Sequence, residues 1–155
     1  HRIMPQARYI VVRRHGVDVA ASLWRRARHE LDTEPERFAG DAHLARFASV
    51  RCLDVGRAFD LWAETEEVFE TLCERTPDAE MLELVYEDFL AEPESGLYDV
   101  VEFLGLEVDT ETVEEAAATV DASRALAHRE DPELATMIDR VRGHPRLSTW
   151  ESDEP

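Results

Sequence analysis

The 155-residue sequence contains no lysine, and all 17 of its basic residues are arginine. Its two cysteines, Cys52 and Cys73, are too far apart for a disulfide framework or a C-x-x-C motif. The six histidines form no H-x-x-x-H pair, so no metal site is predicted. No apolar run approaches the roughly 18–20 residues of a membrane-spanning helix. We therefore expect a cytoplasmic protein without a metal or a membrane partner, and with both thiols reduced and buried.

The charge is also one-sided, because 35 acidic residues against 17 arginines give −18 with histidine neutral. Residues 1–29 nevertheless hold seven arginines and one acid, Asp18, for a local charge of +6, whereas the other 126 residues carry −24. The acidic body argues against nucleic-acid binding. A salt-rich cytoplasm or a codon bias would each explain an acidic chain without lysine. The basic segment suggests a local anion site, although arginines on a solvated helix would cluster in the same way.

The spacing of apolar residues predicts alternating strands and helices. A β-branched run over residues 7–13 predicts a buried strand, and residues 81–86 predict a second one. Residues 32–41 are rich in turn formers and predict a surface loop. The predicted helices are one capped by Asp18, one over 43–75 divided at Gly56, one over 94–103 between Pro93 and Gly105, one over 111–119 capped by Thr110, and one over 132–142.

Strands joined by long helical connections predict an α/β fold, a parallel sheet with helices on its faces. Two strands do not complete such a sheet, so we expect the chain to be part of a longer polypeptide. Residues 1–148 are expected to form a single domain, incomplete at its N-terminus, and the acidic residues 149–155 a disordered tail. Trp24 and Trp62 are expected in the core.

Two residues and a helix start after the first predicted strand suit a phosphate group. Arg14 leaves the strand end, and Ser22 lies one helical turn beyond Asp18 on the same helix face. Ligands of open α/β sheets bind beyond the carboxyl ends of the strands. A guanidinium, a hydroxyl and a helix start together favour a phosphate dianion. A solvated arginine and a helix-surface serine are the alternative interpretation.

The stretch 9–24 resembles the 3′-phosphate-binding motif of the sulfotransferases that use 3′-phosphoadenosine-5′-phosphosulfate (PAPS). That motif consists of a strand, Arg-Asp-Pro-x-Asp, three further residues and Ser. Arg14, Asp18 and Ser22 stand at the matching positions, and Asp18 would organise the helix start rather than contact the phosphate.

A second stretch resembles the other signature of the same family. Residues 84–90 read Leu-Val-Tyr-Glu-Asp-Phe-Leu, followed by Pro93 and by Phe-Leu-Gly at 103–105. The family signature is a strand ending in Tyr-Glu-Asp-Leu, then a helix that begins with Pro and closes in Phe-Leu-Gly. The resemblance covers about residues 5–108 and implies an α/β fold that is part of a P-loop-type parallel sheet.

The resemblance also implies roles for individual residues. Arg14 and Ser22 would hold the 3′-phosphate of PAPS, or of the product adenosine 3′,5′-bisphosphate, and Tyr86 would lie near the adenine. Glu87 and Asp88 belong to the signature, but they would equally serve as the N-terminal cap of the next helix. No catalytic residue is assigned, because the family's catalytic base lies upstream of the 3′-phosphate motif.

The sequence departs from the family pattern at several points. His15 and Gly16 replace the usual Asp-Pro, which predicts a looser turn. The family's C-terminal Arg-Lys-Gly loop has no counterpart, and residues 140–146 are a candidate replacement. The family's glycine-containing loop for the 5′-phosphosulfate, with its Lys, has no counterpart either, since the chain has no lysine.

These observations predict transfer of a sulfuryl group from PAPS to a hydroxyl or amine of a small-molecule or glycan acceptor. The chain would supply the 3′-phosphate and adenine side of the nucleotide site, in association with a missing N-terminal part or as a homodimer. The alternative is a non-catalytic sulfotransferase-like module that binds a nucleotide or a partner. A third interpretation is a nucleotide or sugar kinase of related P-loop architecture. The absence of a recognisable Mg²⁺-binding aspartate argues against it.

Overall fold

The computed structural model describes residues 7–38, 50–77 and 80–147. These residues are mostly helical, with a small parallel sheet of two strands flanked by helices. The α/β prediction is confirmed to this extent, and the P-loop type of the sheet stays a prediction. The elements are β1 (Tyr9–Arg13), α1 (Gly16–Thr33), η1 (Pro35–Phe38), η3 (Arg51–Leu53), α2 (Val55–Cys73), β2 (Met81–Val85), α3 (Tyr86–Ala91), α4 (Pro93–Leu104), α5 (Thr110–Ala117), η5 (Ala122–Arg124), η6 (Ala127–Glu130), η7 (Pro132–Leu134) and α6 (Ala135–Val141).

The chain divides into two compact units, each built from two separate stretches of sequence. His1–Arg14 and Glu70–Leu126 form the first, which we call the strand unit because it holds both strands. His15–Phe69 and Ala127–Pro155 form the second, which we call the helical unit. The single domain expected over residues 1–148 stays a prediction, and the tail at 149–155 lies outside the described residues.

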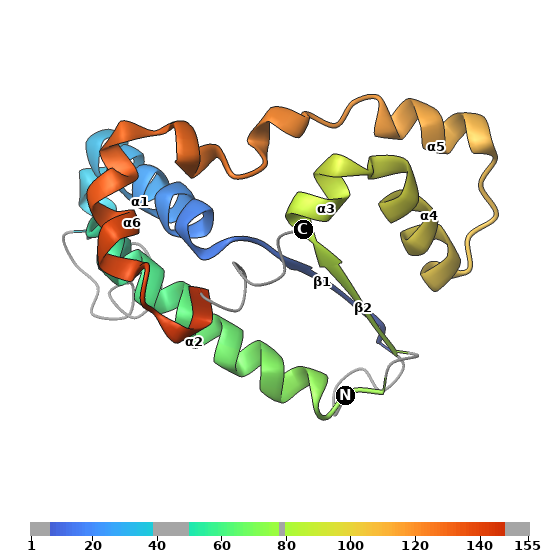
Figure 1. Ribbon diagram of the computed structural model, residues 1–155, viewed down its shortest axis with the longest axis horizontal. Helices are drawn as coiled ribbons and strands as arrows, with labels where there is room; N and C mark the ends of the chain where they lie inside the picture. The colour runs from blue at the N-terminus through green and yellow to red at the C-terminus, as the bar shows by residue number, and fades with distance from the viewer. Residues whose placement is uncertain (1–6, 39–49, 78–79, 148–155) are drawn as a thin grey trace. The chain divides into compact units, whose positions relative to one another are not determined.

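The two strands of the strand unit pair in parallel, from Tyr9 opposite Met81 to Arg13 opposite Val85, and run side by side in Figure 1. Both predicted strands are therefore confirmed. The second is one residue shorter than expected, because Tyr86 begins helix α3.

The prediction that the first strand is buried is wrong, because its residues alternate between half-buried and exposed. Ile10 is 40% exposed and Val12 is 59% exposed, whereas Tyr9 and Val11 are half-buried. Successive side chains of a strand point to opposite faces of the sheet. One face of β1 is therefore not covered by the described residues, and an apolar run alone did not reveal this.

Helices α3 and α4 pack closely against each other in the strand unit. A Cβ placed on Gly96 of α4 would lie 2.5 Å from the Phe89 ring, so this contact requires glycine. The predicted limits of α4 are confirmed: Pro93 is its first residue, and Gly105 ends it in the left-handed conformation at φ 67°. The amide of Gly105 donates to the carbonyl of Glu102, and that of Leu106 to Val101.

Two predicted helix boundaries need correction. Helix α5 is capped by Asp109 rather than Thr110, because the Asp109 carboxylate accepts the amide of Thr112 at 2.8 Å. The single helix expected over 132–142 is instead a short 3₁₀ turn, η7, followed by helix α6.

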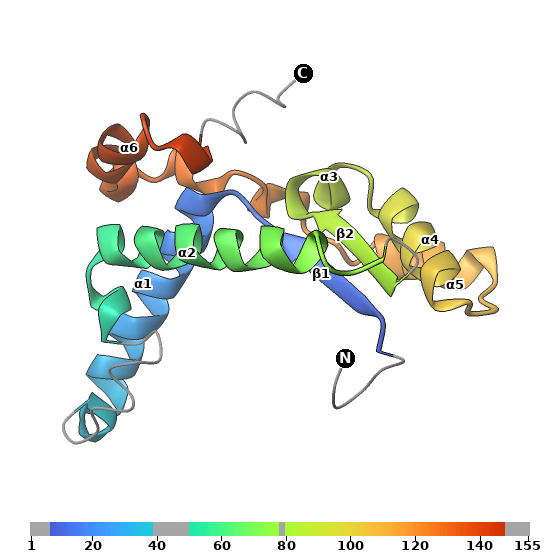
Figure 2. The same ribbon diagram turned by 90° about the horizontal axis from the view of Figure 1, so that it is seen from below.

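The described residues of the helical unit include a cluster of buried apolar side chains contributed by α1, α2, α6 and the turns that connect them. Figure 2 shows α1 and α2 as long helices, with α2 crossing in front of α1. Phe59 and Trp62 are the large aromatic side chains of this cluster, and their ring centroids are 5.0 Å apart. The cluster consists of Val17, Ala20, Ala21, Ala27, Cys52, Ala58, Phe59, Trp62, Ala63, Leu134, Met137, Val141 and Leu147.

Helix α2 begins at Val55, one residue before the expected division at Gly56. The carboxylate of Asp54 accepts the amide of Arg57 at 2.9 Å, and this cap starts the helix at Val55. Gly56 therefore lies in the first turn. The 43–49 part of the predicted helix and residues 39–41 of the predicted loop lie outside the described residues. Within the rest of that loop, residues 32 and 33 are the end of α1, and residues 35–38 form η1.

The expected core residues of the helical unit are only partly buried. Trp62 and Cys52 are buried, as predicted. Trp24 is half-buried, with the guanidinium of Arg28 5.1 Å from its ring centroid, so it lies at the surface of the unit. Cys73, the last residue of α2, belongs to the strand unit and is half-buried, so the prediction that it is buried is wrong.

Candidate functional site

The parallel register of the sheet brings Arg14 and Tyr86 to one edge. Because Arg13 is paired with Val85, the residues that follow them leave the carboxyl ends of both strands side by side. Across the two strands Arg13 also forms an ion pair with Glu83 at 2.7 Å. Arg14 and Tyr86 both lie in the strand unit. Their juxtaposition follows from the pairing of two strands that have 67 residues between them in the sequence.

Arg14 packs its guanidinium on an aromatic ring. Its Cζ atom lies 4.6 Å from the centroid of the Tyr86 ring, within the range of a cation–π contact. Its Nη2 donates a hydrogen bond to the carbonyl oxygen of Arg124 at 3.1 Å. Both side chains are half-buried, so a cation and a flat ring are held together at the carboxyl edge of the sheet.

The carbonyl that receives Arg14 belongs to the short turn η5. Asp121 caps this turn, because its carboxylate accepts the hydroxyl of Ser123 at 2.6 Å and the amide of the same residue at 3.1 Å. These two hydrogen bonds hold the pKa of Asp121 below its usual range. Arg124 was not predicted as part of the site, since nothing local in the sequence connects it with a residue 110 positions earlier.

Ser22 lies on helix α1 in the helical unit, with its side chain exposed. The structure therefore brings together two of the three predicted nucleotide-binding residues, Arg14 and Tyr86, within one unit. Ser22 belongs to the other unit, and its predicted role stays a prediction. Glu87 and Asp88 occupy the first turn of α3, where no side chain caps the helix.

The turn that carries the unusual His15 and Gly16 is tightly packed rather than loosened. Helix α1 begins at Gly16, and Nδ1 of His15 caps it by accepting the amide of Val17 at 3.3 Å. A Cβ on Gly16 would lie 2.5 Å from the Trp62 ring, so the indole occupies the space that any larger residue would need. The prediction of a looser turn is thus wrong, because the sequence does not show that Trp62 packs here.

Asp18 does not cap its own helix, contrary to the prediction. It lies in the first turn of α1, almost fully buried, and its Oδ1 accepts the backbone amide of His128 at 2.8 Å. The Nδ1 atom of His128 lies 3.2 Å from the same oxygen, and the His128 ring stacks on His15 at 4.3 Å between centroids. Asp18 therefore fastens the 127–130 turn to the start of α1.

His128 is a second residue that the sequence reasoning missed, and no signal in the sequence would have found it. It is buried in the helical unit through contacts with residues more than 100 positions away. Among residues 7–38, 50–77 and 80–147, no group of three or more His, Cys, Asp or Glu side chains could hold a metal ion. Within the same residues, no helix is both long and apolar enough to cross a bilayer.

Comparison with known proteins identifies the family. A sequence model described as the sulfotransferase family matches residues 1–110, which include Arg14, Ser22 and Tyr86. This match covers well over half of the chain, so the chain belongs to the sulfotransferase family, as predicted. No significant match was found among curated proteins or among solved structures.

Proposed function

We propose that this chain takes part in the transfer of a sulfuryl group from PAPS to a hydroxyl or amine acceptor, and that it forms the side of the site that holds the 3′-phosphate and the adenine. Membership of the sulfotransferase family supports sulfuryl transfer. The observation that carries the nucleotide assignment is the contact between Arg14 and Tyr86 at the carboxyl edge of the sheet.

The chemistry of these two side chains fits a nucleotide phosphate. A guanidinium presents several N–H donors in one plane and stays charged at any physiological pH, which suits a phosphate dianion. The ring of Tyr86 offers a flat apolar surface for a base. PAPS would supply the sulfuryl group, and Arg14 would hold the phosphate at the other end of the nucleotide.

Ser22 would add a hydroxyl donor to the same phosphate. It is exposed on α1, so a ligand can reach its side chain without rearrangement of the helical core. We propose a small molecule or a glycan as the acceptor, since the acidic body of the chain disfavours a polyanion such as nucleic acid.

The proposal is tested by comparing two ligands that differ only in the 3′-phosphate. Adenosine 3′,5′-bisphosphate and adenosine 5′-phosphate are titrated into the full chain by calorimetry. In the Arg14→Ala variant, the bisphosphate should bind about 10- to 100-fold more weakly, because a hydrogen bond to a charged group is worth roughly 1.5–3 kcal/mol. The affinity for the monophosphate should fall much less in the same variant.

Arg57→Ala is the matched control, because Arg57 is an exposed arginine of α2 and its loss changes the net charge equally. Equal losses for both ligands in Arg14→Ala, or no loss for either, would contradict the assignment. Tight binding of the bisphosphate without transfer of labelled sulfate from PAPS to any acceptor would favour the non-catalytic alternative.

A further inference from the structure

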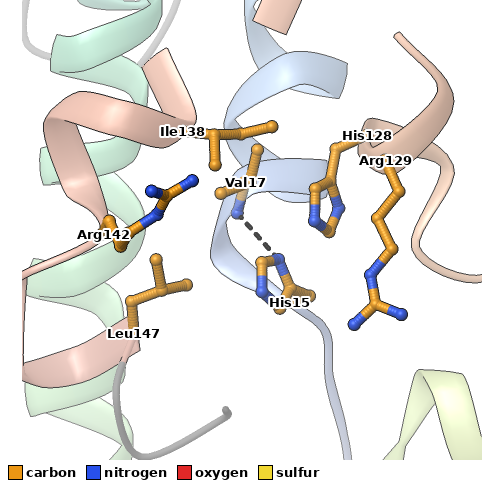
Figure 3. Close-up of a pocket in the computed structure, with 7 residues that line it drawn as sticks. All are labelled: His15, Val17, His128, Arg129, Ile138, Arg142 and Leu147. Atoms are coloured by element: carbon orange, nitrogen blue, oxygen red, sulfur yellow. Dashed lines mark hydrogen bonds between the residues drawn. The ribbon is translucent and has the colours of Figure 1, made fainter. Parts of the chain in front are cut away.

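The helical unit contains a pocket of about 330 Å³ at the start of helix α1. Figure 3 shows the two histidine rings at its centre, with Arg142 on one side and Arg129 on the other. A volume of this size is at the lower end of the range for small-molecule sites. The pocket is lined by His15, Val17, His128, Arg129, Ile138, Arg142 and Leu147.

The charge of this lining is opposite to that of the chain as a whole. Two of the seven lining residues are arginines and two are histidines, and none is acidic. The sequence carries 35 acidic residues and a net charge of −18. A pocket that exposes only cationic and neutral groups on such a chain concentrates the attraction for an anion at one place.

The two histidines are fixed parts of the wall. His15 and His128 are both more than nine-tenths buried, and their rings stack at 4.3 Å with 11° between the ring planes. Asp18 behind them binds the backbone amide of His128, so its carboxylate is engaged with the wall and is not part of the lining. A rigid wall loses little conformational entropy when a ligand binds.

His15 is set to donate rather than to accept. Its Nδ1 accepts the amide of Val17, so the proton of the neutral ring is on Nε2. An imidazole N–H and two guanidinium groups are donors suited to a carboxylate, sulfate or phosphate group. Val17, Ile138 and Leu147 provide an apolar surface beside these donors.

We propose that this pocket binds a small organic anion, with its charged group held by Arg142 and His15 and its apolar part against Val17, Ile138 and Leu147. This assignment goes beyond the proposed sulfuryl transfer and does not depend on it. It requires one occupant with both a charged and an apolar part, because the lining has both.

The test uses phenyl phosphate as the probe, with inorganic phosphate and phenol as its two halves. Calorimetric titration of the full chain should give the tightest binding for phenyl phosphate. The ring resonances of His15 and His128 should shift as the probe is added. Equal affinity for phenol would overturn the assignment of an anionic ligand. Equal affinity for inorganic phosphate would overturn the contribution of the apolar wall to binding.

The decisive variant is Arg142→Ala. Arg142 is exposed and forms an ion pair with exposed Asp139 at 3.2 Å, so its removal should leave the fold intact. Phenyl phosphate should bind about tenfold more weakly, and Arg129→Ala, on the other side of the histidine rings, should have a smaller effect. Arg57→Ala, on α2 of the same unit and outside the lining, is the control and should bind as the natural sequence does. Unchanged affinity for phenyl phosphate in Arg142→Ala would overturn the proposal.

A cross-comparison separates this pocket from the nucleotide assignment. Arg14→Ala should not change the affinity for phenyl phosphate, and adenosine 3′,5′-bisphosphate should not displace phenyl phosphate from the pocket. The two proposals can therefore fail independently. If the bisphosphate displaces phenyl phosphate one for one and Arg142→Ala weakens both ligands, a separate site for an organic anion is ruled out.

Discussion

The helical unit and the strand unit bury their apolar residues very differently. The helical unit encloses one continuous cluster in which Phe59 and Trp62 are buried together with side chains from α1 and α6. Among the described residues of the strand unit, the buried apolar residues are Leu90, Val113 and Ala117. Its large apolar side chains on the surface are Ile10, Val12, Tyr98, Leu104, Leu106 and Val108.

This difference bears on where stability and binding reside. Burial of apolar area is the main favourable term in folding, so the helical unit should hold most of the stability of the chain. The contact between Arg14 and Tyr86 lies in the unit with fewer buried apolar residues. Regions of low apolar burial open first in the native state, and ligand sites are often drawn from them.

The largest effect is expected from Phe59→Ala in the helical unit. Phe59 is 1% exposed and packs against Trp62 and His144, so its removal should leave a cavity and lower the free energy of unfolding by about 3–5 kcal/mol. Val12→Ala in the strand unit should change it by roughly 0.5 kcal/mol or less, because Val12 is mostly exposed. Urea titrations followed by circular dichroism measure both values. Similar losses for the two variants would contradict the contrast between the units.

A smaller loss is expected when Gly16 is changed to alanine. The new methyl group would have to displace the Trp62 ring, which costs about 1–3 kcal/mol in a packed core. Gly143→Ala is the control in the same unit, because a Cβ there meets no atom within 4 Å. Thermal unfolding of the two variants should separate them clearly. If Gly16→Ala were as stable as Gly143→Ala, the turn at Gly16 would have space for a methyl group, contrary to the contact with Trp62.

The smallest effect is expected when acid protonates Asp109, the residue that caps α5 in the strand unit. Hydrogen bonds from Thr112 hold the pKa of Asp109 below its usual range. Its cap therefore stabilises the unit fully above the pKa of an unfolded aspartate, about 3.9, and the contribution is lost as the pH falls through the lower folded value. The Thr112 amide resonance, followed by NMR between about pH 6 and 2, should report this titration.

Asp109→Asn is the control for this titration. An asparagine still caps a helix but has no proton to gain, so the Thr112 resonance should lose that transition. A transition of the same size and midpoint in the variant would assign it to another group.

The sequence predicted what local signals encode. Pro93 and Gly105 mark the two ends of α4, since each residue type fits one end of a helix by its own backbone geometry. Arg14 and Tyr86 could be placed at one sheet edge because residues that follow parallel strands meet there. These inferences need only a few neighbouring residues and one rule about sheets.

The features that the sequence did not predict depend on contacts with residues far away in the sequence. Asp18 was expected to cap its own helix, but a partner 110 residues later takes its carboxylate. The turn at Gly16 was expected to be loose, but Trp62 fills the space around it. The exposure of Val12 depends on what covers a sheet face, which an apolar run does not encode. Long-range packing thus decided each prediction that was wrong.

The interleaved order of the two units has a consequence for synthesis on the ribosome. The helical unit needs Leu134, Met137, Val141 and Leu147 from the last stretch of the chain to complete its core. Helices α1 and α2 therefore leave the ribosome long before the side chains that cover them. The nascent chain would expose the Phe59 surface during that interval, and chaperones that bind apolar segments have their longest opportunity there. For the same reason, no single cut in the gene separates one unit intact from the other.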